Sequence, residues 1–232
     1  MNVVSIMAHQ DDEMRCLGTM LKCKNRGDKL YFITVTDGSN GVLNENREEA
    51  ARIRFEEMSK LASEIDAKYI CLGKVDEFLY DTREVRKSLI EVIRKTKANI
   101  IFTHYFNDYN LDHTTVAELV RHCAMLSCIP IIKTKSKPLK DHPAIFMIEP
   151  HGPINFPATH FVDITEYEDH KVELLKNHKS QEEAMQLAVG AGLKKLVNRP
   201  DAYWGEQVGC EYAECFIPMP GRGAIKPYSV LP

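Results

Sequence analysis

Apolar runs alternate along the chain with longer segments in which apolar residues recur every three or four positions. The runs predict strands at residues 3–8, 30–36, 68–72, 99–103, 144–149 and 160–164. The intervening segments predict helices at 14–26, 44–66, 82–97 and 113–127, and we expect a long helix after Glu166. Strands that alternate with helices favour right-handed crossovers. The pattern therefore predicts a Rossmann-like α/β fold, with a mainly parallel sheet and helices on both faces.

The first four predicted strands should form the parallel core, within about residues 1–130. We expect the first and fourth to be neighbours where the strand order reverses, because open α/β sheets carry their sites there. Further strands, a helix and a tail follow at about 144–232. From about Val197 the helical pattern ends in a Gly- and Pro-rich segment that contains Trp204, which predicts an irregular C-terminal extension. We interpret residues 1–232 as one domain.

The loop after the first predicted strand, residues 9–13, carries one imidazole and three carboxylates but no glycine. Phosphate-binding loops need glycine and free backbone N–H groups, so this composition favours metal ligands and bases. The alternative is that Asp11 and Asp12 cap the next helix, because acidic residues suit a helix N-terminus. His9 lies three positions before Asp12 at the carboxyl end of a strand, which favours a site.

A second cluster, from His104 to His113, follows the fourth predicted strand and precedes another helical pattern. The alternative here is that Asp112 caps that helix and His113 is a partly buried first-turn residue. Taken together, His9 and Asp12 from one loop and His113 from the other give two histidines and one carboxylate. Three protein ligands leave a fourth position for water, as in catalytic zinc sites. The two clusters therefore predict a divalent-metal hydrolase.

These residues resemble motifs of the zinc-dependent N-acetylglucosamine de-N-acetylases of the PIG-L/LmbE type. The family's Ala-His-Pro-Asp-Asp-Glu corresponds to residues 8–13, with Gln10 in place of proline, and Asp108 and Asn110 lead to its closing Asp112-His113. Further matches extend the resemblance over nearly the whole chain: Arg54 with Glu57, residues 161–165, His178-Lys179-Ser180-Gln181 and residues 212–216.

The resemblance implies a zinc cofactor, with Fe²⁺ as another candidate, held by His9, Asp12 and His113. It implies Asp11 as the general base that activates metal-bound water, and removal of an N-acetyl group from an amino sugar such as an N-acetylglucosaminyl compound. Asn110 stands where some members have a histidine. Asparagine can donate a hydrogen bond but cannot shuttle a proton, so Asp11 or another histidine would have to protonate the leaving amine.

Several further residues are candidates for supporting roles. We expect Arg54, Asn110 and Asp108 to bind substrate, and Asp112 and His104 to orient the metal ligands. For Arg54, a pair with Glu57 within its helix is the alternative.

Two loops also bear on the site. Residues 37–41 follow the second predicted strand and could place backbone amides near substrate. The lysine-rich loop 130–143 is either a solvated surface loop or a lid that meets an anionic substrate.

Composition supports a small-molecule enzyme in the cytoplasm. The chain has 232 residues, which suits one α/β domain, and a net charge of −3, which gives no electrostatic case for nucleic acid. Seven cysteines without a Cys-x-x-Cys pair argue against a disulfide framework. Neither a signal peptide nor a membrane span is visible in the pattern. A homo-oligomer stays open, as do an amidase for a thiol conjugate or malate-linked glucosamine and a non-catalytic sugar- or metal-binding protein.

Overall fold

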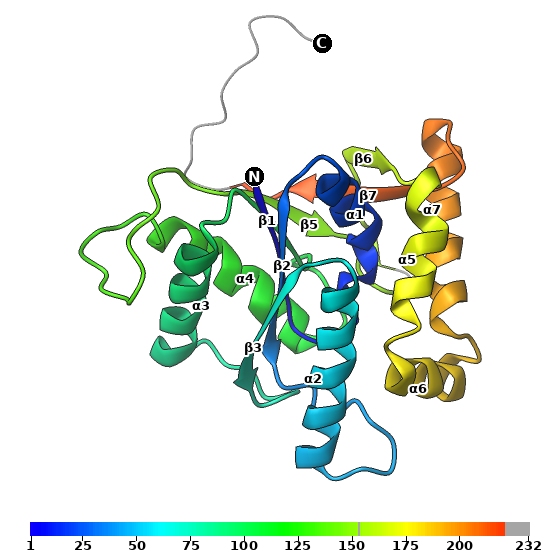
Figure 1. Cartoon of the computed structure of the whole chain (residues 1–232), viewed down its shortest axis with the longest axis horizontal. Coiled ribbons are helices and arrows are strands. Elements are labelled where there is room, and N and C mark those ends of the chain that lie inside the picture. The colour runs from blue at the N-terminus through cyan, green and yellow to red at the C-terminus, as the bar shows by residue number, and fades with distance from the viewer. Residues whose placement is uncertain (153, 221–232) are drawn as a thin grey trace, which may run out of the picture.

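In the computed structural model, which describes residues 1–152 and 154–220, seven strands form one sheet in the order β3-β2-β1-β4-β5-β7-β6 (Figure 1). The strands are β1 (Asn2–Met7), β2 (Lys29–Thr36), β3 (Lys68–Lys74), β4 (Ile100–Thr103), β5 (Ala144–Ile148), β6 (His160–Asp163) and β7 (Ala213–Pro218). The first five are parallel, and β7 runs antiparallel to both of its neighbours. The predicted α/β fold with a mainly parallel sheet is confirmed.

Helices cover both faces of the sheet (Figure 1). They are α1 (Leu17–Asn25), α2 (Arg47–Glu64), α3 (Arg83–Thr96), α4 (Leu111–Leu126), α5 (Glu168–Leu175), α6 (Lys179–Val189) and α7 (Leu193–Val208), with short 3₁₀ helices η1 (Asp12–Arg15) and η2 (Thr165–Tyr167). Successive side chains of β1 pack on opposite faces of the sheet. Val3 belongs to the apolar cluster with α1, α2 and α5, whereas Val4 belongs to the cluster with α3 and α4. Burial on both faces explains why the parallel strands are continuous apolar runs.

Strand β1 lies at the centre of the sheet, between β2 and β4. The chain proceeds from β1 through β2 to β3 on one side, and then returns to place β4 and β5 on the other. The expectation that the first and fourth strands are neighbours at the reversal is therefore confirmed. Parallel strands end at the same edge, so the loops that follow β1 and β4 meet there.

The predicted irregular segment from about Val197 is wrong for residues 197–218, which continue α7 and form β7. Pro200 lies inside α7, where proline costs about 3 kcal/mol of helix stability. Tertiary packing outweighs that cost, because Val197 and Asp201 are both buried. The predicted tail beyond residue 220 lies outside the described residues.

The single long helix expected after Glu166 is also wrong. Three helices, α5, α6 and α7, occupy this region, separated at Lys176–His178 and at Gly190–Gly192. Gly190 adopts a left-handed conformation with φ 65°, which ends α6. Because β6 and β7 extend the same sheet as β1–β5, the C-terminal part packs onto the parallel core. The prediction of one domain stays a prediction.

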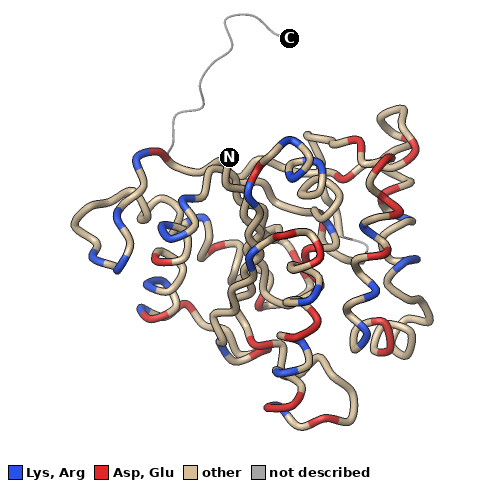
Figure 2. The backbone as a smooth tube through the Cα atoms, viewed as in Figure 1, with Lys and Arg blue, Asp and Glu red and all other residues tan. Residues whose placement is uncertain are grey.

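The lysine-rich loop 130–143 connects the end of α4 to the start of β5, so it lies at the edge of the sheet opposite the β1 and β4 loops. Figure 2 shows its basic residues on the left of the molecule. Arg94 donates hydrogen bonds to the carbonyls of Ile132 (2.8 Å) and Ile129 (2.9 Å), and Glu91 accepts one from Ser136 N (2.9 Å). The alternative of a lid over the site is therefore wrong, and the segment is a surface loop.

Within the described part of the chain, each helix is either too short or too polar to cross a lipid bilayer.

Candidate active site

The three predicted metal ligands converge where the strand order reverses. His9 and Asp12 follow β1, and His113 lies in the first turn of α4. His9 Nδ1 is 3.2 Å from His113 Nε2, His113 Nε2 is 3.3 Å from Asp12 Oδ1, and His9 Nδ1 is 3.4 Å from Asp12 Oδ2. Tetrahedral ligands at zinc distances lie about 3.3 Å from one another. The three side chains therefore fit one small divalent cation.

A carboxylate lies behind each of the two histidines. His9 Nε2 is 2.9 Å from Asp76 Oδ1, and His113 Nδ1 is 3.1 Å from Asp108 Oδ2. Burial lowers the pKa of His113, but the charge of Asp12 and the contact with Asp108 together raise it to about 9. Such carboxylates fix the ring orientation of metal-binding histidines. The structure thus places Asp108, expected to bind substrate, where it orients His113.

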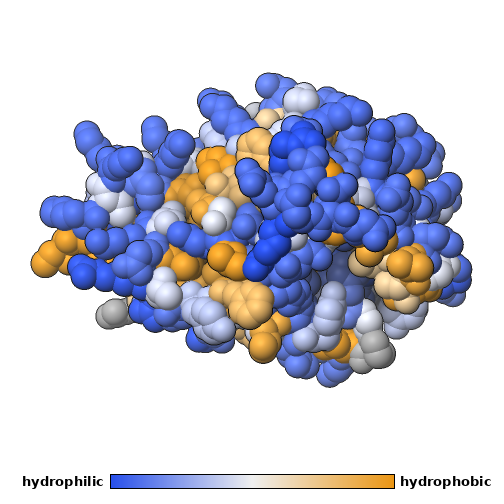
Figure 3. All heavy atoms as spheres, turned by 90° about the horizontal axis from the view of Figure 1, so that it is seen from below, coloured by the Kyte–Doolittle hydropathy of each residue, from blue (hydrophilic) through white to orange (hydrophobic). Residues whose placement is uncertain are grey.

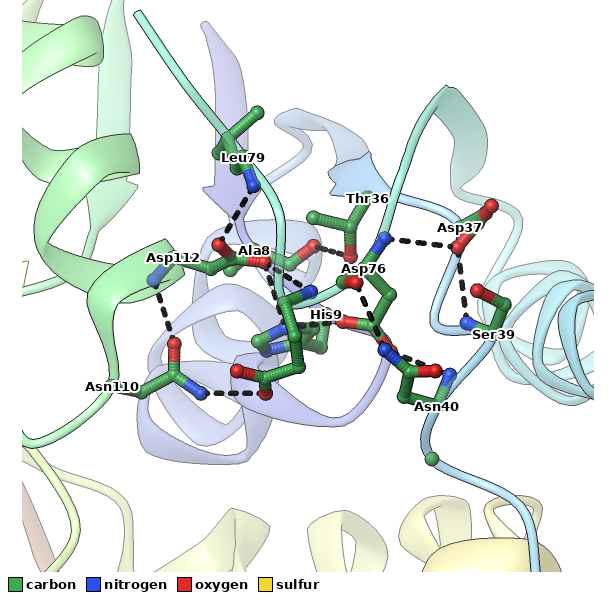
Figure 4. Close-up of polar contacts among 12 residues, drawn as sticks. Ala8, His9, Thr36, Asp37, Ser39, Asn40, Asp76, Leu79, Asn110 and Asp112 are labelled. Atoms are coloured by element: carbon green, nitrogen blue, oxygen red, sulfur yellow. Dashed lines mark hydrogen bonds and ion pairs between the residues drawn. The ribbon is translucent and has the colours of Figure 1, made fainter. Parts of the chain in front are cut away.

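Asp76, which follows β3 at the same edge of the sheet, was not among the predicted site residues. Its side chain and backbone are held by the loop of residues 37–41 (Figure 4). Asn40 N donates to Asp76 Oδ2 (2.8 Å), and Asp37 Oδ1 accepts from Ser39 N (3.0 Å) and Asp76 N (3.3 Å). The loop predicted near the functional edge therefore positions the carboxylate behind His9. The rule that selected the loops after the other parallel strands would also have found Asp76.

Asn110 caps α4 and so fixes the first turn that carries His113. Its Oδ1 accepts from Asp112 N (2.7 Å) and His113 N (3.3 Å), and its Nδ2 donates to Glu77 Oε1 (3.0 Å). Asp112 accepts instead from the backbone of Glu77 (2.9 Å) and Leu79 (3.1 Å) (Figure 4). The alternative in which Asp112 is the cap is therefore wrong. Asp112 ties the loop after β3 to α4, and Asn110 lines the pocket.

His104 lies directly beneath His113. The two rings stack with centroids 4.0 Å apart and planes 10° apart, and His104 Nε2 accepts a hydrogen bond from Ala8 N (2.9 Å). Burial and the charge of His113 lower the pKa of His104 to about 4. A neutral, buried His104 therefore supports the metal loop and the ligand ring from below.

Asp11 has a strained backbone, with φ 120° in the region that favours glycine. Such conformations cost on the order of 1–3 kcal/mol and persist where the surroundings hold them. Glu13 Oε2 accepts from Asp11 N (2.9 Å), while Arg54 Nη2 donates to Asp11 Oδ1 (2.8 Å) and to the Gln10 carbonyl. The Asp11 side chain makes no capping hydrogen bond to η1, so the capping alternative is wrong for it. The hydrogen bonds from Arg54 and to Glu13 instead hold this strained residue so that its carboxylate lies at the pocket.

His178 and Ser180, from the later motif matches, contact the metal loop and α2 directly. His178 Nε2 contacts Glu13 Oε1 at 2.6 Å, and Glu57 accepts from Ser180 N (2.8 Å) and Ser180 Oγ (2.6 Å). Arg54 pairs with Asp11, and Glu57 is used by Ser180, so the pair within α2 proposed as an alternative is not formed. The start of α6 thus braces both the metal loop and α2.

A cavity of about 570 Å³ opens over this cluster. Figure 3 views the molecule from this edge and shows its surface hollowed there. Most of its polar lining residues come from the loops at the strand ends. Its apolar lining comes largely from α6 and α7 and consists of Met14, Ile154, Met185, Ala188, Val189 and Leu196. The cavity is large enough for a small molecule, as ligand pockets typically occupy about 300–1,000 Å³.

Fold and site together define an α/β protein with a candidate metal centre of two histidines and one aspartate. The family model described as GlcNAc-PI de-N-acetylase, PIG-L, matches residues 4–124. The chain therefore belongs to the PIG-L family, and the resemblance drawn from its sequence is confirmed.

Comparisons extend over most of the chain. It is 28% identical over 236 residues to a diacetylchitobiose deacetylase of Thermococcus kodakarensis, covering 94% of this chain and 83% of the relative. The structure of N,N′-diacetylchitobiose deacetylase from Pyrococcus horikoshii with an inhibitor matches with a TM-score of 0.82 and 25% identity, covering 95% of this chain and 84% of that one.

A third similarity concerns the fold alone. The 4-carboxy-2-hydroxymuconate hydratase GalB from Pseudomonas putida KT2440 matches with a TM-score of 0.81 and 18% identity, covering 98% of this chain and 99% of that one. A hydratase with this fold means that the fold does not fix the reaction, which must be argued from the site.

Proposed function

We propose that the protein is a metal-dependent amide hydrolase that removes an N-acetyl group from an amino sugar. The observation that carries the proposal is the triangle of His9, Asp12 and His113 side chains, whose nearest nitrogen and oxygen atoms are 3.2–3.4 Å apart, beside a strained, half-buried Asp11. The diacetylchitobiose deacetylase relatives support an acetamido sugar as the substrate class.

A divalent cation at this triangle would supply a Lewis acid, which lowers the pKa of water and polarises the amide carbonyl. Asp11 is the general base in this proposal. Burial raises the pKa of Asp11, whereas the adjacent Arg54 guanidinium lowers it and keeps the carboxylate fixed at 2.8 Å. A held carboxylate beside the metal ligands can accept a proton from the attacking water.

Asp11 also returns that proton to the leaving amine. Asn110 has no proton to give, and its amide nitrogen already donates to Glu77. Arg54 lines the pocket, and in residues 1–152 and 154–220 its Nε and Nη1 have no hydrogen-bond partner. We assign these nitrogens to a sugar hydroxyl of the substrate, in line with the role expected from sequence.

The strain at Asp11 also bears on the alternative of a non-catalytic binding protein. Metal ligation needs His9, Asp12 and His113, but it does not need Asp11 in a conformation that favours glycine. Strain of this kind is typical of functional sites, because selection otherwise removes its cost. The cost therefore favours catalysis over binding alone.

The first test is metal content together with amine release. Purified protein should carry about one divalent ion per chain, and His113→Ala should lose it because one of three protein ligands is removed. His122→Ala, on the same helix but outside the triangle, is the matched control and should keep the ion. Amine release from N-acetylglucosamine and from diacetylchitobiose should stop on chelation and return with Zn²⁺ or Fe²⁺. Equal metal content and equal turnover in native and chelated samples would overturn the proposal.

A further inference from the structure

Arg15, the last residue of η1, is a buried cation with unused hydrogen-bond donors at the pocket. It is 8% exposed and lines the cavity. Its Nη2 contacts His151 Nδ1 at 3.0 Å, and its Nη1 lies 3.8 Å from Glu149 Oε2, too far for a hydrogen bond. Among residues 1–152 and 154–220, neither Nε nor Nη1 of Arg15 has a hydrogen-bond partner.

Another buried arginine shows what a purely structural role looks like in this protein. Arg94 is 2% exposed, and its guanidinium donates five hydrogen bonds, to the Ser127, Ile132, Leu126 and Ile129 carbonyls and to Thr134 Oγ1. Arg15 makes one. A buried donor without a partner costs about 1–3 kcal/mol, and more when it is charged. The open donors of Arg15 therefore call for a partner that arrives through the cavity.

His151, which follows β5, lies beside Arg15 and also lines the cavity. Burial and the charge of Arg15 lower the pKa of His151 to about 3, so its ring is neutral. Because Nδ1 faces the Arg15 donor, Nε2 carries the hydrogen. His151 and the three predicted metal ligands line the same cavity. Arg15 and His151 together thus present hydrogen-bond donors in the cavity in which the amide would react.

We propose that Arg15 and His151 form a subsite for an oxyanion of the substrate, a carboxylate or a phosphate monoester. This inference rests on the proposed deacetylase function and narrows its substrate class to N-acetyl amino sugars that carry an acidic group. A guanidinium suits this role because its fixed N–H groups match the oxygens of carboxylate and phosphate. Glu149 accepts from Trp204 Nε1 at 2.9 Å and forms only a long ion pair with Arg15, so it leaves the Nε and Nη1 donors without a hydrogen bond.

The topology gives this subsite a direction. Arg54 belongs to the helix that follows β2, and His151 belongs to the loop that follows β5. These strands lie on opposite sides of the β1–β4 pair that carries the metal ligands. The amide would lie over the centre of the sheet, with sugar hydroxyls toward Arg54 and the acidic group toward Arg15.

The test compares charged and uncharged substrates with metal-loaded, full-length protein. The panel is N-acetylglucosamine, its 1-phosphate and 6-phosphate, and N-acetylmuramic acid with its methyl ester. At least one anionic compound should have kcat/KM about tenfold or more above its neutral counterpart, the usual worth of one charge-assisted hydrogen bond. In Arg15→Gln this ratio should fall to about one, mainly through KM. Arg15→Lys should give an intermediate ratio, because lysine keeps the positive charge but cannot donate two parallel hydrogen bonds to one oxyanion.

Arg52→Gln is the matched control, because it removes the same charge from an exposed position on α2 and should leave the ratio unchanged. A wild-type protein that hydrolyses the neutral compounds and shows no preference for the anionic ones would overturn the subsite and leave the proposed function standing. That result does not depend on whether the Arg15 variants fold. A preference that persists in folded Arg15→Gln would also overturn it. Failure to hydrolyse any of these sugars would overturn the proposed function and the subsite together.

Discussion

Two clusters of buried charge differ in a way that separates function from structure. The metal-side cluster is His9, Asp12 and His113 at the carboxyl ends of β1 and β4. The Lys171 cluster is Lys171, Asp201 and Glu214, between α5, α7 and β7. Lys171 Nζ donates to Asp201 Oδ2 (2.5 Å) and to Glu214 Oε1 (2.8 Å). Glu214 also accepts from the backbone of Gly18 (2.9 Å) and Thr19 (2.7 Å).

In the Lys171 cluster the ammonium group of Lys171 donates to both carboxylates. The three residues are absent from the lining of the cavity described above. In the metal-side cluster, three side chains that can each ligate a metal face one another beside that cavity. Buried charges need partners, and both clusters supply them by ion pairing. Burial of charge alone is therefore a poor guide to a site. Convergence of potential metal ligands at a cavity is a better one.

The largest expected effect comes from Asp11→Asn, which keeps the size of the side chain and removes its basicity. Turnover should fall by about two to four orders of magnitude, the usual worth of a general base. Metal content should stay the same, because Asp11 is not one of the three ligands. The melting temperature should fall only modestly, because asparagine can still accept the hydrogen bond of Arg54 although the ion pair is lost. Amine release, metal analysis and thermal unfolding check this together. Loss of the ion would mean that Asp11 ligates it, and wild-type turnover would remove Asp11 from the mechanism.

Lys171→Met should have the opposite profile. It leaves Asp201 and Glu214 as buried, unpaired carboxylates, so the free energy of unfolding should fall by about 3–5 kcal/mol. The metal content of the folded protein should not change. Urea unfolding measures the loss, and Lys176→Met, at an exposed ion pair on the same stretch of chain, is the control. Unchanged stability with lost turnover would place the Lys171 cluster among the functional residues and break the comparison.

Asp76→Asn should weaken metal binding by about 10- to 100-fold, the usual effect of losing the carboxylate behind a ligating histidine. The fold should persist, because asparagine can keep the contacts with the loop of residues 37–41. Metal titration against a competing chelator gives the affinity. Asp66→Asn, at an exposed aspartate paired with Lys24, should leave the affinity unchanged. Equal affinity in both variants would mean that Asp76 does not orient His9.

The smallest effect concerns Glu168, next to the Lys171 cluster. Burial, together with the charges of Asp201 and Glu214, raises the pKa of Glu168 to about 7 although Lys171 acts to lower it. The folded state therefore holds a proton that the unfolded chain releases above about pH 4.5. This stability is fully present below pH 4.5 and is lost as the pH rises through 7, by on the order of 1–3 kcal/mol. Between pH 5.5 and pH 8 the urea midpoint should fall less in Glu168→Gln than in the wild-type protein. In the control Glu166→Gln it should fall as in the wild type. An unchanged pH dependence in Glu168→Gln would contradict the shift.

The parallel core was predictable because its signals are local. Strands buried on both faces are mostly apolar, and the rule that sites lie at carboxyl strand ends selects His9, Asp12 and His113 from the sequence. The resemblance contributed the expected role of Asp11, which stays a prediction. The structure adds that Asp11 is strained and held by Arg54, a contact between residues 43 positions apart.

The supporting residues could not be found in this way. Asp76 acts on His9 from 67 positions away, and Glu13 depends on His178, 165 positions away. No local pattern records such pairs. Helix α7 was missed because Pro200 breaks its pattern, and Arg15 was passed over because its signal is the absence of partners, which only coordinates can show.

The position of β7 also constrains the order of folding. Within residues 1–152 and 154–220, strand β6 pairs only with β7, and β7 lies between β6 and β5 in the sheet (Figure 1). A growing chain can therefore assemble β1–β5 and all three predicted metal ligands while β6 still has no neighbour. Glu214, which anchors the start of α1, also arrives late. The three predicted metal ligands lie in the part of the chain made before β7, whereas α7, which supplies Leu196 to the cavity, packs against β7. Long-range pairing of this kind is slow, and it leaves unpaired strand edges exposed during synthesis.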